Sequence, residues 1–449
     1  MLRRVIYAAG LGLIILLMGA ASAPPAVTVY AESPQHIWNR LHQRFFVRTA
    51  WDGTTYGADE LDPLLWLETK YLLSGPSHQQ ALAELNQFLS SHAEHQIADP
   101  LKRAMFQRDM WAVFDWLESA ENGSPESRAA LQKRLATIIS RVALSRQQIL
   151  SLSDNYAQAV ASKTFSQQYD SAKSDVAFLP ADLLDANGPW VCLGRIGGLT
   201  APSHSDFTSG RSVFLVFLRL PQGRDAALAY LEQLRNFPDP LVPNHKEFYE
   251  LLRNVGDGAS LVPNPRLPQF PAGTEVALVR RMILIDDKGQ PEVSPITESV
   301  QIRVYRDVPS RPTWKQGSFR DFQDVDEFRL SRQRLFAGES GGLRPLAPNA
   351  QGFPQFMSHG MDEFETEPDT HEHRTAPVRM HLLETCGECH DAPGIHSLIS
   401  YVRGPFLLSD PPAPMDLRES TPLQEEQGAV EQLRLRAQWK NLQEMTFGR

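Results

Sequence analysis

Cysteine is scarce in this sequence, which has only Cys192, Cys386 and Cys389 among its 449 residues. So small and odd a number excludes a dense framework of disulfides as the source of stability. A surplus of basic residues is also missing, because 53 Asp and Glu outweigh 44 Lys and Arg and give a formal net charge of −9. Proteins that bind nucleic acid need a basic surface, so we exclude nucleic acid as a partner.

Long apolar runs are missing beyond the N-terminus, where MLRR precedes VIYAAGLGLIILLMGAASA. A basic start, an apolar run and small residues behind it are typical of a secretory signal peptide. We predict that residues 1–31 are this signal, cleaved after Ala23 or Ala31, and that the protein is exported to the periplasm, the cell surface or the medium. The alternative is an uncleaved segment that associates with the membrane, since the run nearly reaches the ~20 residues of a spanning helix.

Two of the three cysteines stand in one short motif, Cys386-Gly-Glu-Cys389-His390. In the attachment of haem c, two thiols at this spacing bind the porphyrin, and the histidine that follows supplies its imidazole to the iron. The alternatives are a Cys2His2 zinc site and a redox-active or structural disulfide. Export favours haem c. Cys192 lies among apolar and small residues and is expected to be a small buried hydrophobe.

On these residues the C-terminal region, 375–449, resembles the c-type cytochromes. The resemblance implies one covalent haem c on Cys386 and Cys389, with His390 as the proximal iron ligand. It further implies a closing helix over 424–447 and a methionine in a proline-containing loop as the sixth ligand, for which Met415 in DPPAPMDL is the candidate.

Met415 follows the motif so closely that the sixth ligand stays open. His396 is too near His390 in sequence to reach the other face of the haem easily. The remaining candidates are His359, His373, His381, Met357, Met361 and Met380.

Upstream of this region the hydrophobic pattern changes twice. Runs at helical period predict a helical domain over 32–165, with Asp99 and Ser124 at the starts of two helices. Runs of β-branched and aromatic residues predict an α+β domain with antiparallel strands over 166–308, including a hairpin around DDKGQ. Proline, glycine and charge predict an extended connector over 309–374. The expected fold class is therefore multidomain, α plus α+β, with a mostly helical cytochrome c-like region at the C-terminal end.

Three stretches inside these domains have uncertain chemical meaning. The methionines and aromatics at helical spacing in ADPLKRAMFQRDMWAVFDWLES are expected to fill a core. His204, Asp206 and Arg211 in SHSDFTSGR either line a pocket or belong to an ordinary loop before a strand. GESGG at 338–342 indicates flexibility only.

The function expected from the sequence is electron transfer by an exported, c-type cytochrome-like protein with one covalent haem and an unknown redox partner. One alternative is a haem enzyme or small-ligand sensor with an open sixth position on the iron. Another is a non-haem surface or assembly protein in which the two cysteines hold zinc or form a disulfide. The sequence has no H-E-x-x-H and no Walker-type phosphate loop that would indicate a different catalytic chemistry.

Overall fold

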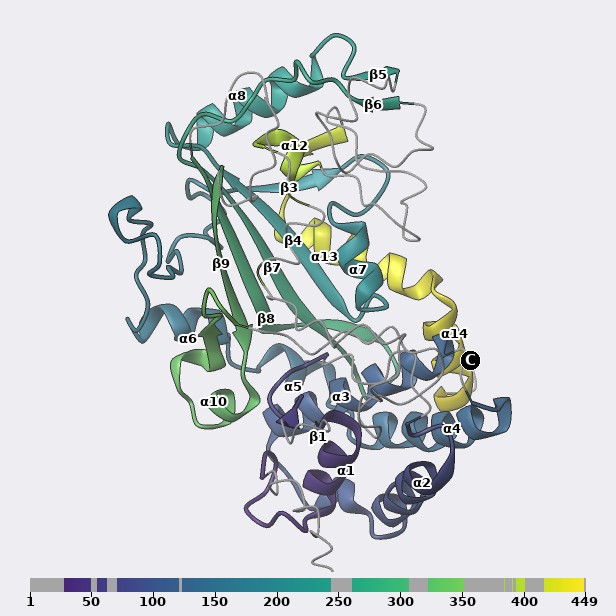
Figure 1. Ribbon diagram of the computed structural model, residues 1–449. Helices are drawn as coiled ribbons and strands as arrows, with labels where there is room; N and C mark the ends of the chain where they lie inside the picture. The colour runs from purple at the N-terminus through teal and green to yellow at the C-terminus, as the bar shows by residue number, and fades with distance from the viewer. Residues whose placement is uncertain are drawn as a thin grey trace, which may run out of the picture.

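The computed structural model describes residues 28–49, 55–62, 71–120, 123–243, 261–306, 322–350, 383, 390, 393–399 and 416–447. These residues form an antiparallel sheet with helices packed against it (Figure 1), so the chain is a mixed α and α+β protein as expected. The apolar run at the N-terminus lies outside them. Among the described helices, none is both long enough and apolar enough to cross a bilayer.

Helices dominate the first part of the chain. They are α1 (Ile37–Phe46), α2 (Gly75–Ser90), α3 (Pro100–Ser119), α4 (Pro125–Arg141), α5 (Arg146–Leu150) and α6 (Asn155–Ala161), with a small strand pair, β1 (Arg48–Thr49) and β2 (Thr55–Tyr56).

The two predicted helix starts are confirmed. The Asp99 carboxylate accepts hydrogen bonds from the backbone N–H groups of Leu101 and Lys102, at 2.8 and 3.1 Å. The Ser124 hydroxyl accepts one from the N–H of Ser127 at 3.1 Å. These oxygens satisfy donors that have no partner within the first helical turn, which is why α3 and α4 begin where they do.

A seven-stranded antiparallel sheet crosses the molecule in the order β10-β9-β8-β7-β4-β3-β11. Its strands are β3 (Val191–Arg195), β4 (Ser212–Arg219), β7 (Thr274–Ile285), β8 (Pro291–Tyr305), β9 (Gln323–Leu330), β10 (Leu343–Pro345) and β11 (Leu417–Glu419). The predicted hairpin is confirmed as β7 and β8. Its turn is stabilised by Asp286, whose carboxylate accepts hydrogen bonds from the N–H groups of Lys288 and Gln290 at 2.9 and 2.7 Å.

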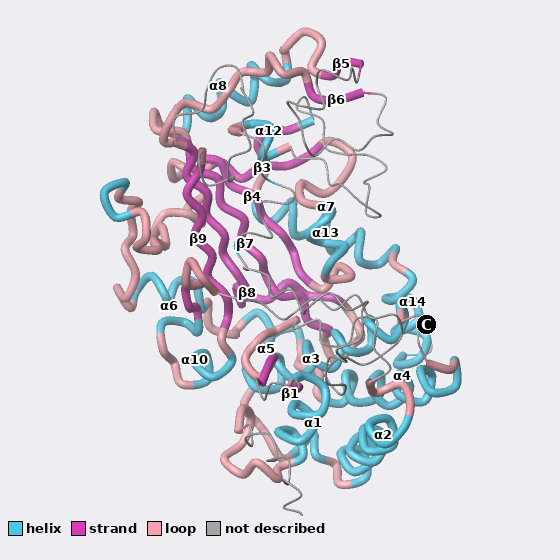
Figure 2. The backbone as a smooth tube through the Cα atoms, in the orientation of Figure 1, coloured by secondary structure: helices cyan, strands magenta, loops and turns pink. Residues whose placement is uncertain are grey.

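The remaining elements surround the sheet. Figure 2 shows the first helices of the chain at one end of the view and α8 and α12 at the other. These elements are α7 (Pro202–Phe207), α8 (Arg224–Arg235), the strand pair β5 (Leu241–Pro243) and β6 (Leu261–Pro263), α10 (Arg332–Phe336), α12 (Ile395–Leu398), α13 (Pro422–Leu435) and α14 (Ala437–Phe447), together with the short 3-10 turns η1 (Ala93–His95), η2 (Ser171–Lys173) and η4 (Ser340–Gly342).

The strands divide their side chains between two apolar clusters. On β4, Val213 and Leu215 join the larger cluster, which also contains residues of α1 to α6, α13 and α14. Val216 and Leu218 join a smaller cluster with α8 and α12. This alternation follows from the pleat of a strand, which points successive side chains to opposite faces. We call the side of the sheet that bears the smaller cluster the α12 face.

Two segments differ from the expectation. Strands β9 and β10 lie within 309–374, where an extended connector was predicted, and both are paired in the sheet. The single helix expected over 424–447 is two helices, because Arg436 between α13 and α14 has an extended backbone. These two helices pack against β4 and α4 respectively.

Candidate functional site

Only part of the motif falls in the described chain. His390 is described, whereas Cys386, Cys389 and Met415 lie outside the described residues. The same holds for the candidate ligands His359, His373, His381, Met357, Met361 and Met380. The geometry of the site therefore begins with His390 and its neighbours.

Within the described part of the chain, three hydrogen bonds position His390. Its Nδ1 donates to the backbone carbonyl of Ser397 at 2.7 Å, while the Ser397 hydroxyl and the Gln323 amide donate to the carbonyl of His390 at 3.1 and 2.8 Å. Because a carbonyl oxygen can only accept, the imidazole proton must be on Nδ1. In the neutral ring the lone pair is then on Nε2, which is the arrangement in which a histidine binds a metal ion.

A second imidazole, that of His204 on α7, faces His390. The two ring centroids are 6.1 Å apart and the ring planes differ by 16°. Burial lowers the pKa of His204 to about 4 and that of His390 well below its usual value, and the positive charge of Arg303 lowers both pKa values further. Both rings are therefore neutral at neutral pH, as metal ligation requires.

Arg303 on β8 brings an unbalanced positive charge to this site. The residue is 4% exposed, and its guanidinium donates hydrogen bonds to the neutral side chains of Gln301 and Gln323. Within the described chain no carboxylate pairs with it, since Glu327 on the same face pairs with Arg329 at 2.6 Å. A buried charge without a counter-ion is costly. An anionic group of a ligand would neutralise it.

His396 is buried a short distance along the chain from His390. It belongs to α12, is 2% exposed, and neither of its ring nitrogens has a hydrogen-bond partner. Burial lowers its pKa to about 4. Its ring does not contact that of His390 in the described structure, so the imidazole that faces His390 is that of His204.

The polar cluster predicted from SHSDFTSGR does not form one pocket. His204 faces His390, whereas Asp206 pairs with Arg436 at 2.7 Å on the surface. Arg211 extends toward the helices, where it pairs with Asp115 and with Asp62. The three side chains are neighbours in sequence but serve three separate contacts.

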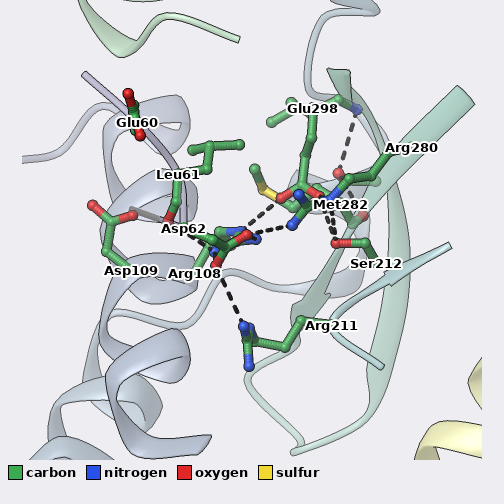
Figure 3. A network of polar contacts seen from close by, with 12 residues as sticks. Glu60, Leu61, Asp62, Arg108, Asp109, Arg211, Ser212, Arg280, Met282 and Glu298 are labelled. Atoms are coloured by element: carbon green, nitrogen blue, oxygen red, sulfur yellow. Dashed lines mark hydrogen bonds and ion pairs between the residues drawn. The ribbon is translucent and has the colours of Figure 1, made fainter. Parts of the chain in front are cut away.

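Charged side chains, of which the sequence analysis singled out only Arg211, meet between α3 and the sheet (Figure 3). Arg108 on α3 donates to Asp62 at 2.8 and 2.6 Å and to Glu298 on β8 at 2.6 Å. Arg280 on β7 contacts the same two carboxylates. We call this group the buried ion cluster, and it comprises Asp62, Asp115, Glu298, Arg108, Arg211 and Arg280.

The buried ion cluster is balanced in charge. Burial alone would raise the pKa of Asp62, but Arg108, Arg280 and Arg211 outweigh it and hold that pKa well below its usual range. Burial raises the pKa of Asp115 to about 6 against the effect of Arg211. Three carboxylates meet three guanidiniums, so the cluster leaves no base or nucleophile unpaired. Its geometry is that of a cross-link between α3 and the sheet.

One signal for this cluster was present in the sequence. Arg108, Trp111 and Asp115 are three and four residues apart, so they share one face of α3. That face also carries apolar residues, and all three side chains are buried. Charged residues on the apolar face of a helix indicate buried ion pairs. The spacing along the helix does not show which residues of distant strands are their partners.

Residues 338–342, Gly-Glu-Ser-Gly-Gly, were expected to indicate flexibility only, and the expectation that the chain has no G-x-S-x-G was wrong, because these residues match that spacing of serine hydrolase nucleophiles. Such a nucleophile lies between a strand and a helix, whereas Ser340 follows α10 and precedes β10. Its hydroxyl lies 3.0 Å from that of Thr164. Among the described residues no histidine contacts Ser340, so the structure gives no support for a nucleophile there.

A group of metal-ligand type lies on the surface at η1. The ligand atoms of His92, Glu94 and His95 are within 4.8 Å of one another. The two histidines are exposed, while the buried Glu94 already pairs with Arg141 at 3.4 Å. A guanidinium at this distance opposes the binding of a cation. The group is therefore a poor metal site.

Cys192 on β3 is a buried free cysteine, as the sequence predicted. Its side chain belongs to the larger apolar cluster and burial raises the pKa of its thiol to about 12, helped by Glu425. A thiol with so high a pKa is neither a nucleophile nor a metal ligand at neutral pH.

We compared the chain with protein-family models, with curated proteins and with solved structures, and nothing in these three comparisons matched. The geometry around His390 and the motif that contains it are therefore the basis for the function.

Proposed function

We propose that this chain is an exported, c-type cytochrome-like protein that transfers electrons through one covalent haem c. Cys386 and Cys389 would hold the haem and His390 would be its proximal iron ligand. The observation that carries the proposal is the hydrogen bond from His390 Nδ1 to the Ser397 carbonyl at 2.7 Å. It orients the ring and places the lone pair on Nε2, as expected for a histidine that binds a metal ion directly after a C-x-x-C pair.

The surroundings of His390 suit this group in a second way. Haem carries two propionate carboxylates, and Arg303 supplies a buried guanidinium that has no carboxylate partner in the described chain. Gln323 connects the two groups, because its side chain accepts a hydrogen bond from Arg303 at 3.3 Å and donates one to the His390 carbonyl at 2.8 Å. Arg303 would therefore bind a propionate and fix the haem against the sheet.

The remaining parts of the chain are assigned roles on the same proposal. Haem would supply one-electron transfer at its iron. The helical part, 32–165, and the strand-rich part, 166–308, would form a scaffold, and the region 375–449 would contribute the haem. Export through the segment 1–31 would place the protein in the periplasm or at the cell surface, where it meets a redox partner protein. If that segment is not cleaved, it would also hold the chain at the membrane.

The deciding experiment is a test for covalent haem. The full chain is exported in cells that possess the haem c attachment machinery, separated by denaturing electrophoresis and stained for haem, with intact-mass measurement alongside. The variants are Cys386→Ala/Cys389→Ala and, as a matched control, Cys192→Ala, which removes the buried thiol that lies outside the motif. We expect covalent haem in the wild type and in the Cys192 variant, and none in the double variant.

Two results would overturn the proposal. An exported wild-type chain without a haem adduct would exclude a c-type cytochrome, and bound zinc in its place would favour a Cys2His2 site. Haem that stays attached in the double variant would show that the two cysteines are not the point of attachment.

A further inference from the structure

Two cleavage sites were predicted for the export signal, after Ala23 and after Ala31, and they differ in whether Tyr30 stays in the exported protein. We propose that the signal is removed upstream of Thr28, so that the exported chain keeps Tyr30 as part of its core. Of the two predicted sites only Ala23 allows this. The proposal rests on the export that the proposed function includes, and it does not depend on the haem.

The side chain of Tyr30 is buried among aromatic rings of the helical part. The residue is 1% exposed and belongs to the larger apolar cluster. Its ring centroid lies 5.3 to 5.8 Å from those of two residues on α1, one on α3 and one on α10, namely Trp38, His42, Phe106 and Phe336. A signal peptide is removed from the mature protein and contributes nothing to its core. A ring buried this deeply therefore indicates a residue that is retained.

The hydroxyl of Tyr30 has a partner inside the same core. It donates a hydrogen bond to the carboxylate of Asp109 on α3 at 2.7 Å. Burial, aided by the charge of Asp109, raises the pKa of Tyr30, so the phenol stays protonated and can donate. The same carboxylate oxygen lies 3.5 Å from Nδ1 of His42, and the other oxygen pairs with Arg332. Loss of Tyr30 would leave a buried carboxylate oxygen without its short hydrogen bond, which is costly.

The backbone at Ala31 is also bound to the helices. The fully buried side chain of Asn39 on α1 accepts hydrogen bonds from the N–H groups of Tyr30 and Ala31, at 2.7 and 3.3 Å. It donates to the carbonyls of Ala31 and Ser33, at 2.6 and 2.8 Å. Lys102 on α3 donates to the carbonyl of Tyr30 at 2.8 Å. Cleavage after Ala31 would leave Asn39 with only the bond to Ser33, and a buried amide without partners destabilises the fold.

Cleavage after Ala31 would thus damage the helical part in two ways. It would empty the space that the Tyr30 ring fills between α1, α3 and α10, and large cavities in a core are strongly destabilising. It would also remove the hydrogen-bond partners of Asn39 and Asp109. Cleavage upstream of Thr28 keeps all of these contacts. Tyr30 then fixes the first residues of the exported chain against α1 and α3.

The first test reads the N-terminus of the full chain after export, by N-terminal sequencing and intact mass. The variants are Ala31→Leu and Ala23→Leu, because a large side chain directly before a cut blocks a site that requires a small residue. We expect the wild type to begin at Pro24. Ala31→Leu should have the same N-terminus, whereas Ala23→Leu should accumulate the uncut precursor.

The stability of the purified exported protein is an independent readout, measured by unfolding in urea. Tyr30→Phe keeps the ring and removes only the hydroxyl, so the folding equilibrium constant should fall roughly tenfold. Tyr30→Ala should lower it by roughly a hundredfold or more. The matched control is Thr28→Ala at an exposed position, which should change it by less than about twofold. If residue 30 were removed with the signal, no substitution there could change the stability.

The outcomes separate this proposal from the cytochrome proposal. An exported chain that begins at Glu32, or an unchanged stability in Tyr30→Ala, would overturn retention of Tyr30. A chain that keeps Met1 would overturn removal of the signal. Haem is stained in the same samples, and a chain that begins at Pro24 without haem would overturn the cytochrome alone.

Discussion

The carboxylate of Asp62 accepts two hydrogen bonds from the guanidinium of Arg108, at 2.8 and 2.6 Å, from a helix that begins almost forty positions later in the chain. The same carboxylate contacts Arg211 and Arg280, which belong to the sheet side of the buried ion cluster. One carboxylate thus contacts three guanidiniums.

Removing the charge of Asp62 should destabilise the protein strongly. In Asp62→Asn the three guanidiniums lose a shared carboxylate and remain buried, and breaking a buried ion pair typically costs about 3–5 kcal/mol. The measurement is the free energy of unfolding in urea. Asp175→Asn, at an exposed position with no ion pair among the described residues, is the matched control and should change the free energy of unfolding by less than about 0.5 kcal/mol. Equal effects of the two substitutions would show that the cluster does not link α3 to the sheet.

The stability of the protein should rise with pH between about 4 and 6.5 because of His396. Its folded pKa is about 4, below the usual 6.5, so the unfolded chain binds the additional proton in this window. The contribution of His396 to the free energy of unfolding is therefore fully present above the unfolded pKa. It is lost as the pH falls toward the folded pKa, by roughly 3 kcal/mol in all.

The variant His396→Leu isolates this effect. It removes a titrating group and two buried nitrogens that lack partners, so it should stabilise the chain at pH 5 more than at pH 8. Chemical unfolding of both chains at several pH values gives the difference directly. A difference that is the same at all pH values would mean that His396 does not titrate on unfolding.

Gly341 should not tolerate a side chain. Its φ is +60°, and a Cβ atom added there would lie 1.9 Å from the carbonyl oxygen of Asn155. Gly341→Ala should lower the free energy of unfolding by more than about 2 kcal/mol. The strain of a side chain at positive φ adds to the cost of displacing α6. Gly338→Ala is the control for backbone strain alone, since φ is +71° there but no atom lies within 4 Å. Thermal unfolding of the two variants should differ clearly, and equal losses would contradict the close approach.

If the chain binds haem as proposed, the charge of Arg303 should raise the reduction potential of that haem. Arg303→Gln removes a buried positive charge beside His390 and His204, which favours the oxidised iron, so the potential should fall by the equivalent of about 1 kcal/mol. Potentiometric titration of the holoprotein measures this shift. Arg219→Gln removes an equal charge that is paired with Glu275 at 3.8 Å, and its effect should be much smaller. A potential unchanged in Arg303→Gln would exclude this residue from the haem site.

Local rules recovered much of the fold from the sequence. Asp99 and Ser124 predict the starts of their helices because a capping oxygen accepts hydrogen bonds from N–H groups within three residues. The hairpin around Asp286 is predictable from the sequence because its turn is also local. Strand β9 was missed, because QDVDEFRL places acidic residues where a strand is usually apolar. Strand β11 has three residues and no pattern of its own; it forms because β3 is there to pair with it.

Some residues of the candidate site could be predicted from local sequence and others could not. His390 follows from a motif of five residues. His204 could be noted as a polar residue before a strand, but nothing in its surroundings predicts that it faces His390. The buried ion cluster joins residues that lie as much as 218 positions apart, as for Asp62 and Arg280. Such pairings depend on the packing of α3 on the sheet, which local patterns do not encode.

The last described stretch, 416–447, packs against elements that lie far earlier in the sequence, among them β3 and α3. Its strand pairs with β3, Leu442 is fully buried, and Trp439 packs on Trp111 of α3 at 5.8 Å between ring centroids. The stretch is therefore held to the remainder as a bound peptide would be. A protease that cuts once between the motif and β11 should leave two fragments that stay together until they are denatured.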